Sequence, residues 1–181
     1  CLPQPDARVL MQTGTCGLVH LVTGGTGAGK THYSIQLATK LRGVRFSIDD
    51  WMTRLFWMDG PQPPSFEWAM ERIGRCEAQI RCEVETLARL GIPSILDLGF
   101  TRADHRAAFV DFATEIGTSA TLHWINISAE QRWQRVLQRN EEQGVTFAMD
   151  VNRAMFDFME GEWEPPSDKE LSDFNGQIIR S

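Results

Sequence analysis

The stretch GGTGAGKT, residues 24–31, constrains the fold of this chain more than any other feature. It matches the pattern G-x-x-x-x-G-K-[ST] through Gly24, Gly29, Lys30 and Thr31, and it stands between an apolar run and a helical pattern. Glycines let successive backbone N–H groups point inward, and the start of a helix adds free N–H groups and the positive end of its dipole. The pattern therefore predicts a loop that wraps around a polyphosphate. We expect that loop to consist of Gly24, Gly25, Thr26, Gly27, Ala28, Gly29, Lys30 and Thr31.

Two side chains in the loop predict the chemistry of its ligand. Lys30 supplies a full positive charge to the β- and γ-phosphates, and the Thr31 hydroxyl is expected to bind Mg²⁺. The loop alone does not separate a GTPase, a motor ATPase and a kinase. The chain has no N-K-x-D motif for reading guanine, and the run SILDLG has a single acidic residue. These absences favour a small phosphotransferase that uses ATP and Mg²⁺.

The rest of the chain alternates between strand and helix patterns. Apolar runs ending in glycine or polar residues predict strands at 17–24, 44–49, 94–99, 121–127 and 177–181. Helical periodicity predicts helices at 31–42, 66–90, 104–116, 128–142 and 151–163. This alternation is typical of an α/β protein with a parallel sheet covered on both faces. Two stretches break the pattern: residues 51–65, aromatic and then proline-rich, and the polar residues 141–150.

Composition narrows the function classes. The chain has 181 residues and a net charge of −6, which fits one soluble domain and argues against a grip on nucleic-acid backbone. No apolar run reaches the ~18 residues that span a membrane. The four cysteines lack C-x-x-C spacing, which favours reduced thiols in a cytoplasmic protein over a lipid-modified Cys1. We expect an N-terminal tail at 1–16 and one domain at 17–181.

Three aspartates are candidates for the site. Asp49 and Asp50 end the second predicted strand, and Asp97 ends the third. In open parallel sheets the ligand crevice lies at the carboxyl ends of the strands, so these side chains should face the phosphate loop. We predict that Asp49 accepts the proton of the attacking hydroxyl, with Asp50 as the alternative base. We expect Asp50 to cap the following turn and Asp97 to support the metal with Thr31.

Arginines recur at helical spacing. Arg132, Arg135 and Arg139 fall at i, i+3 and i+7, on one helical face, and we expect them to bind the triphosphate, with Arg135 or Arg139 stabilising the moving phosphoryl group. The alternative is pairing with Glu130, Glu141 or Glu142 on a solvated face. Arg102 and Arg106 are further candidates for holding substrate or phosphate.

An aromatic cluster follows Asp49. It consists of Trp51, Leu55, Phe56 and Trp57, and it has two interpretations. The cluster forms a wall of the acceptor pocket, suited to a flat molecule, or it packs against the helix at 66–90. The four histidines, at 20, 32, 105 and 123, are scattered, and none is assigned to catalysis.

Taken together, GGTGAGKT, SIDDW, ILDLGFTRADHR, TLHWINISAEQRWQRVLQRN and MFDFMEGEWEPP resemble the small P-loop kinases called AAA-type predicted kinases. These are relatives of chloramphenicol phosphotransferase, zeta toxins and the kinase domain of polynucleotide kinase. The resemblance implies a three-layer P-loop NTPase fold with strand order 2-3-1-4-5 and a helical lid at about 132–155. It also implies that Asp49 acts on the acceptor hydroxyl and that lid arginines close on the phosphates.

The expected function is transfer of the γ-phosphate of ATP to a hydroxyl of a small molecule, of antibiotic, nucleoside or nucleotide-sugar type. Two alternatives stay open: a 5′-hydroxyl polynucleotide kinase, and a non-catalytic ATP-binding switch or toxin-type interaction protein. The sequence predicts neither the acceptor nor the oligomeric state.

Overall fold

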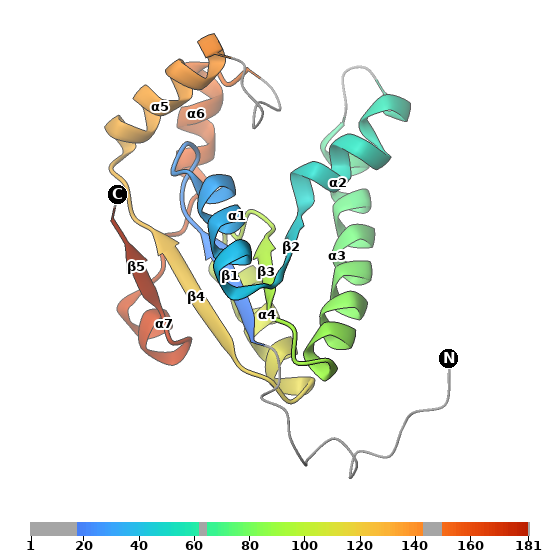
Figure 1. Cartoon of the computed structure of the whole chain (residues 1–181). Coiled ribbons are helices and arrows are strands. Elements are labelled where there is room, and N and C mark those ends of the chain that lie inside the picture. The colour runs from blue at the N-terminus through green and yellow to red at the C-terminus, as the bar shows by residue number, and fades with distance from the viewer. Residues whose placement is uncertain (1–17, 62–64, 143–149, 181) are drawn as a thin grey trace.

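The computed structural model describes residues 18–61, 65–142 and 150–180. Within them, five strands form one parallel sheet in the order β2-β3-β1-β4-β5, which confirms the order that the resemblance implied (Figure 1). The strands are β1 (Val19–Thr23), β2 (Val44–Ser47), β3 (Ser94–Asp97), β4 (Ala120–Ile125) and β5 (Gln177–Ile179). The predicted tail at 1–16, the prolines at 63–64 and most of the polar stretch 141–150 lie outside the described residues, and the proposed domain boundary stays a prediction.

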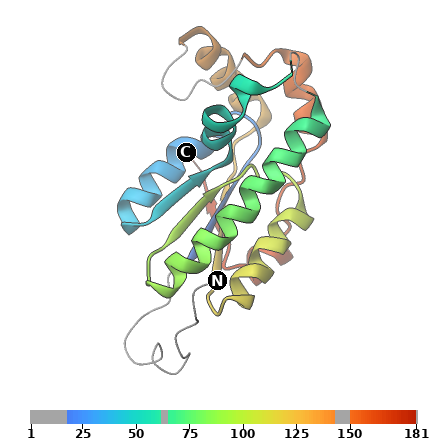
Figure 2. The ribbon, with the colours of Figure 1, turned by 90° about the vertical axis from the view of Figure 1, so that its right-hand side faces the viewer.

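Helices cover both faces of this sheet. Helix α1 (Lys30–Leu41) packs on one face, and α3 (Phe66–Arg89) and α4 (Ala103–Glu115) lie side by side on the other (Figures 1 and 2). The remaining helical segments are α2 (Ile48–Leu55), η2 (Trp57–Asp59), α5 (Ala129–Glu142), α6 (Arg153–Gly161) and α7 (Asp168–Asp173). None of the helices in the described ranges is both long and apolar enough to cross a membrane.

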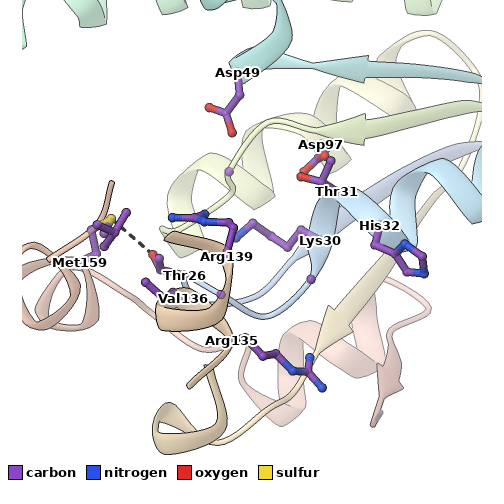
Figure 3. A pocket seen from close by; sticks show the side chains of 14 residues that line it. Thr26, Lys30, Thr31, His32, Asp49, Asp97, Arg135, Val136, Arg139 and Met159 are labelled. Carbon is purple, nitrogen blue, oxygen red and sulfur yellow. Dashed lines mark hydrogen bonds between the residues drawn. The ribbon is translucent and has the colours of Figure 1, made fainter. Parts of the chain in front are cut away.

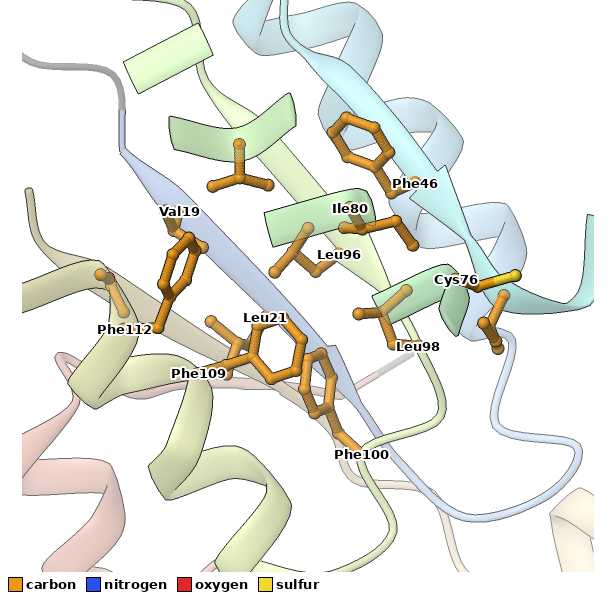
Figure 4. Packing of buried hydrophobic residues seen from close by; sticks show 14 of the residues in the cluster. Val19, Leu21, Phe46, Cys76, Ile80, Leu96, Leu98, Phe100, Phe109 and Phe112 are labelled. Atoms are coloured by element: carbon orange, nitrogen blue, oxygen red, sulfur yellow. The ribbon is translucent and has the colours of Figure 1, made fainter. Parts of the chain in front are cut away.

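The larger core lies between the strands and the α3–α4 layer (Figure 4). Leu21, Leu96 and Leu122 on three adjacent strands have no exposed surface, and Ile80 and Phe109 meet them from α3 and α4. Burial of each such side chain stabilises the fold by roughly 1.5–3 kcal/mol. This apolar layer fixes the carboxyl ends of the strands, from which the site is built.

Helix α1 turns a partly polar face to the sheet. Ser34 and Leu37 are buried, whereas the apolar Ile35 is 47% exposed. Ser34 can be buried because its side chain has two hydrogen-bond partners on the strands: the hydroxyl donates to Asp97 at 3.0 Å and accepts from Arg45 at 2.8 Å. A polar network at the sheet edge therefore determines the rotation of the helix.

The second strand ends two residues earlier than predicted. Helix α2 begins at Ile48, and the Ser47 hydroxyl caps it by accepting a hydrogen bond from the Asp50 backbone N–H. The cap is thus Ser47 and not Asp50, and Asp49 lies in the first helical turn. The aromatic part of residues 51–65, expected to be irregular, continues α2 and enters η2.

Helix α7 was not predicted. Ser167 and Glu170 form a reciprocal capping box at its start, in which each side chain accepts from the other residue's backbone N–H. Helix α6 was predicted at 151–163, and the structure has it shorter because Asn152 caps its first turn. The S-x-x-E spacing of the capping box is a sequence signal that could have located α7.

Candidate functional site

The glycine-rich loop joins the carboxyl end of β1 to α1. Gly27 has φ +79°, and a Cβ there would lie 2.5 Å from the carbonyl oxygen of Arg132, so the turn requires glycine. Lys30 folds back over the loop, where its Nζ donates to the Gly24 carbonyl at 2.9 Å and the Gly25 carbonyl at 3.3 Å. No side chain caps α1 and its first turn has no acidic residue, so its N-terminal N–H groups face the loop without an internal anion.

This loop forms the floor of a cleft of about 460 Å³. Asp49 and Lys30 approach it from opposite walls, and Arg139 extends over the floor from α5 (Figure 3). The structure thus brings together most of the predicted site residues on four separate segments. The lining residues are Thr26, Gly27, Gly29, Lys30, Thr31, His32, Asp49, Asp97, Gly99, Arg135, Val136, Arg139, Val151 and Met159.

Asp97 ends β3 and is held in a fixed orientation. Its Oδ2 accepts hydrogen bonds from Arg45 at 2.7 Å and from Ser34 at 3.0 Å, and only 7% of the residue is exposed. Arg45 also pairs with Asp50 at 2.8 Å, which ties the start of α2 to β3. Both hydrogen bonds use Oδ2, and Asp97 is one of the residues that line the cleft.

Asp49 and Lys30 influence each other across the cleft. The surrounding protein raises the pKa of the Asp49 carboxyl, the charge of Asp97 raises it further, and Lys30 opposes both. Burial lowers the pKa of Lys30, while Asp97 and Asp49 hold it up. An aspartate with a raised pKa is a better proton acceptor than a free one.

Thr31 and Asp97 offer oxygen atoms at the same end of the cleft. No cluster of three or more metal-binding His, Cys, Asp or Glu side chains exists in the described ranges. Mg²⁺ does not need such a cluster, because it keeps several waters and is usually held by one or two protein oxygens plus substrate phosphates. The donors present therefore fit Mg²⁺ brought in with a nucleotide.

The three arginines of α5 have different positions. Arg135 and Arg139 line the cleft, and Arg135 donates to the Ala28 carbonyl at 3.3 Å. Arg132 is 5% exposed and lies behind the loop, where its carboxylate partner is Glu160 on α6 and none of the three glutamates considered from the sequence. Its predicted contact with the nucleotide stays a prediction, but its side chain does not line the cleft.

Two further arginines proposed as ligands do not reach the cleft. Arg106 has no exposed surface; it binds Glu170 at 2.8 and 3.1 Å and the carbonyls of Phe100 and Glu164 at 3.1 and 2.9 Å. Arg102 is exposed and pairs with its neighbour Asp104. The sequence predicted the same role for both arginines. In the structure helix α4 turns Arg106 inward, where Glu170 neutralises its charge.

The aromatic residues after Asp49 support the packing interpretation. Trp51 and Phe56 pack against the larger core, and Trp57 lies 5.5 Å from the Trp68 ring on α3. Among the described residues that line the cleft, His32 alone has a ring in its side chain. His32, Gly99, Val136, Val151 and Met159 were not predicted to line the cleft, and no local pattern marks them.

A pair of histidines lies outside the cleft, between neighbouring strands. His20 Nδ1 and His123 Nε2 are 2.9 Å apart, and the Tyr33 hydroxyl is 2.8 Å from His123 Nδ1. Burial and the neighbouring His20 lower the pKa of His123 to about 4. Both rings are therefore neutral near pH 7, as members of a packed polar chain.

Comparisons with known proteins agree with this geometry. Residues 19–166 match the family model described as AAA domain. A putative kinase from Chloroflexus aurantiacus superposes with a TM-score of 0.67 at 18% identity, over 92% of this chain and 88% of that one. The APS kinase CysC of Mycobacterium tuberculosis, solved with AMPPNP and APS, superposes with a TM-score of 0.59 at 14% identity, over 91% and 88%.

A chain of the Pnkp1/Rnl/Hen1 RNA repair complex is also similar, with a TM-score of 0.66 and 15% identity over 93% of this chain. The present chain spans about half, 49%, of the length of that one. No curated protein sequence gives a match. At these identities the likeness establishes the fold, which is that of P-loop kinases.

Proposed function

Because the chain belongs to the AAA domain family, whose model covers residues 19–166, we propose that it is an ATP- and Mg²⁺-dependent kinase that phosphorylates a hydroxyl of a small molecule. One observation carries the proposal: a phosphate-type loop, a lysine, two carboxylates and two arginines converge on a single cleft of about 460 Å³. The likeness to an APS kinase solved with AMPPNP supports ATP as the phosphoryl donor.

Each group has a role in phosphoryl transfer. The loop amides and Lys30 hold the β- and γ-phosphates, and Arg135 and Arg139, which line the same cleft from α5, balance charge on the transferred group. Thr31 and Asp97 are the residues that would hold Mg²⁺, which supplies charge neutralisation between the phosphates. Asp49 faces the loop across the cleft, where the acceptor must enter.

The reaction is an in-line displacement. The acceptor oxygen forms a bond to the γ-phosphorus while the bond from that phosphorus to the β–γ bridging oxygen breaks, and ADP leaves. The hydroxyl proton passes to the Asp49 carboxylate. The raised pKa of Asp49 favours this proton transfer, and the positive charge of Lys30 acts in the other direction by favouring the ionised carboxylate.

The lining also bears on the acceptor. Trp51 and Phe56 pack against the larger core, and no aromatic residue after Asp49 is among the described residues that line this cleft, so the lining does not favour a stacked ring. The cleft is lined by charged residues as well as by apolar ones, and the charged groups favour a hydroxyl-rich acceptor. The charged residues are Lys30, Asp49, Asp97, Arg135 and Arg139, and the apolar ones are Val136, Val151 and Met159. The net charge of −6 argues against a polynucleotide.

The test is product detection. The purified protein is incubated with MgATP and a metabolite extract, and mass spectrometry looks for species heavier by one phosphoryl group. Asp49→Ala should keep ATP binding and lose transfer, while Asp173→Asn, on distant α7, should behave as wild type. Labelled 5′-hydroxyl oligonucleotides form a second arm. A phosphorylated oligonucleotide, or ATP binding with no product from any pool, would reject the small-molecule kinase.

A further inference from the structure

Arg132 is enclosed at the junction of three segments. Its Nε donates to the Ile127 carbonyl at 3.0 Å, and its Nη1 donates to the Thr26 carbonyl at 3.1 Å. The same guanidinium makes a two-pronged ion pair with Glu160, with Nη1 and Nη2 at 2.5 and 2.6 Å from the two carboxylate oxygens. The guanidinium therefore joins the phosphate loop to helix α6 through α5.

The loop lies directly on this arginine. A Cβ at Gly25 would overlap Arg132 Nη1, and a Cβ at Gly27 would lie 2.5 Å from the Arg132 carbonyl oxygen. The loop backbone therefore has no room to move toward Arg132. A displacement of the Arg132 guanidinium would instead break its hydrogen bond to the Thr26 carbonyl. The position of the guanidinium is transmitted to the loop backbone.

Helix α6, which carries Glu160, is packed against α5. Phe156 on the same helix is 1% exposed, clusters with Val136 and Val151, and lies 5.3 Å from the ring of Trp133 on α5. Glu160 itself sits in the last turn of α6, where the helix dipole disfavours an anion. Its placement is therefore explained by Arg132 and not by the stability of its own helix.

We propose that Glu160 is a positioning residue that sets the phosphate loop through Arg132. In a trans peptide the C=O and the following N–H point in opposite directions. Because Arg132 holds the Thr26 carbonyl behind the loop, the Gly27 N–H is turned to the other side, and Gly27 lines the cleft. Glu160 also neutralises Arg132, whose charge would otherwise act more strongly on Lys30, the pKa of which Arg132 lowers.

This inference rests on the proposed function, in which the loop binds the phosphates of ATP. Without the carboxylate, Arg132 becomes a buried charge with only carbonyl acceptors, and the guanidinium no longer has a single fixed position. The Thr26 carbonyl then loses its fixed donor, and the Gly27 N–H no longer has one orientation. We expect weaker nucleotide binding with little effect on the acceptor.

The experiment compares Glu160→Gln and Glu160→Asp with Asp157→Asn. Asp157 is the matched control because it lies on the same helix and forms an exposed ion pair with Arg153. Calorimetry with MgATP, below the unfolding temperature of every variant, should show Kd raised about tenfold or more in Glu160→Gln. Glu160→Asp should recover part of the affinity, and Asp157→Asn should match wild type. In turnover assays the KM for ATP should rise while the KM for the acceptor stays unchanged.

A merely structural role would lower the unfolding temperature of Glu160→Gln and leave the Kd of the folded protein within twofold of wild type, which would overturn the proposal. The amide signal of Gly27, followed by NMR without nucleotide, separates this failure from that of the proposed function. If wild type fails to bind ATP, a Gly27 shift in Glu160→Gln and not in Asp157→Asn still supports the coupling. If Glu160→Gln does not fold, Glu160→Asp decides by the same two measurements.

Discussion

Replacement of Arg106 by alanine is expected to damage stability and to spare the ligand sites. The guanidinium is fully buried and joins α4 to α7 through Glu170, and it also holds the carbonyls of Phe100 and Glu164. The substitution leaves the Glu170 carboxylate with only its Ser167 donors and removes the Arg106 donor from the carbonyls of Phe100 and Glu164. The loss therefore includes the desolvation of those groups as well as the ion pair itself.

The magnitude follows from the burial. Removal of one partner of a buried ion pair costs about 3–5 kcal/mol, and a domain of this size loses about 2–4 °C per kcal/mol. We therefore expect the unfolding temperature of Arg106→Ala to fall by about 6–20 °C. The double variant Arg106→Met with Glu170→Leu should be less destabilised than the single one, because it removes both charges together.

Thermal unfolding by circular dichroism, together with calorimetry for MgATP, checks this expectation. Arg102→Ala is the control, because Arg102 forms an exposed ion pair with Asp104. This substitution should leave the unfolding transition unchanged. An unfolding temperature of Arg106→Ala equal to wild type, with weakened binding of MgATP, would refute the reasoning. It would restore the ligand role that the sequence spacing indicated.

Four further outcomes follow from three single residues. The pKa of Asp49 is higher in the folded protein than in the unfolded chain, so its ionised form destabilises the folded state at pH 7. Asp49→Asn should therefore raise the unfolding temperature at pH 7, which calorimetry checks, and should abolish transfer, which the product assay checks. The pH profile of wild-type transfer should lose activity on the acid side with a midpoint above the ~3.9 of a free aspartate. The pKa of His123 is about 4 in the folded protein, so between about pH 6.5 and pH 4 the unfolded chain binds a proton that the folded state does not. The free energy of unfolding should therefore fall as pH drops through this range, by at most about 1.4 kcal/mol per pH unit. His123→Gln should flatten that dependence in denaturant titrations. Gly27→Ala should cost about 1–2 kcal/mol of stability and weaken MgATP binding, as denaturation and calorimetry would show; unchanged binding would contradict the role of the turn.

The sequence predicted the parts of the site that depend on local pattern. The loop from Gly24 to Thr31 has its own spacing rule, and Asp97 follows a buried strand, so both could be located without tertiary information. The order of the strands came from the resemblance and is confirmed. The loop and the aspartate at the strand end share one property: the geometry of each is set within a few residues of chain.

The rest depends on partners distant in the sequence. Arg106 and Arg132 resemble solvated or ligand-binding arginines until Glu170 and Glu160 are placed beside them, 64 and 28 residues away. Ser34 is likewise a poor candidate for a buried position until Asp97 and Arg45 supply its hydrogen bonds. Periodicity assigns polar residues to the surface, and it fails where a buried polar group is satisfied by another segment.

The central claim is that the cleft holds the triphosphate of a nucleotide through the loop and Lys30. Isothermal titration of wild type and Lys30→Ala with MgATP tests it most directly. We predict saturable binding to one site in wild type and a loss of affinity of about a hundredfold, roughly 2.7 kcal/mol, in a folded Lys30→Ala variant. Equal affinity in the two proteins, or no binding of MgATP to wild type, would contradict the account.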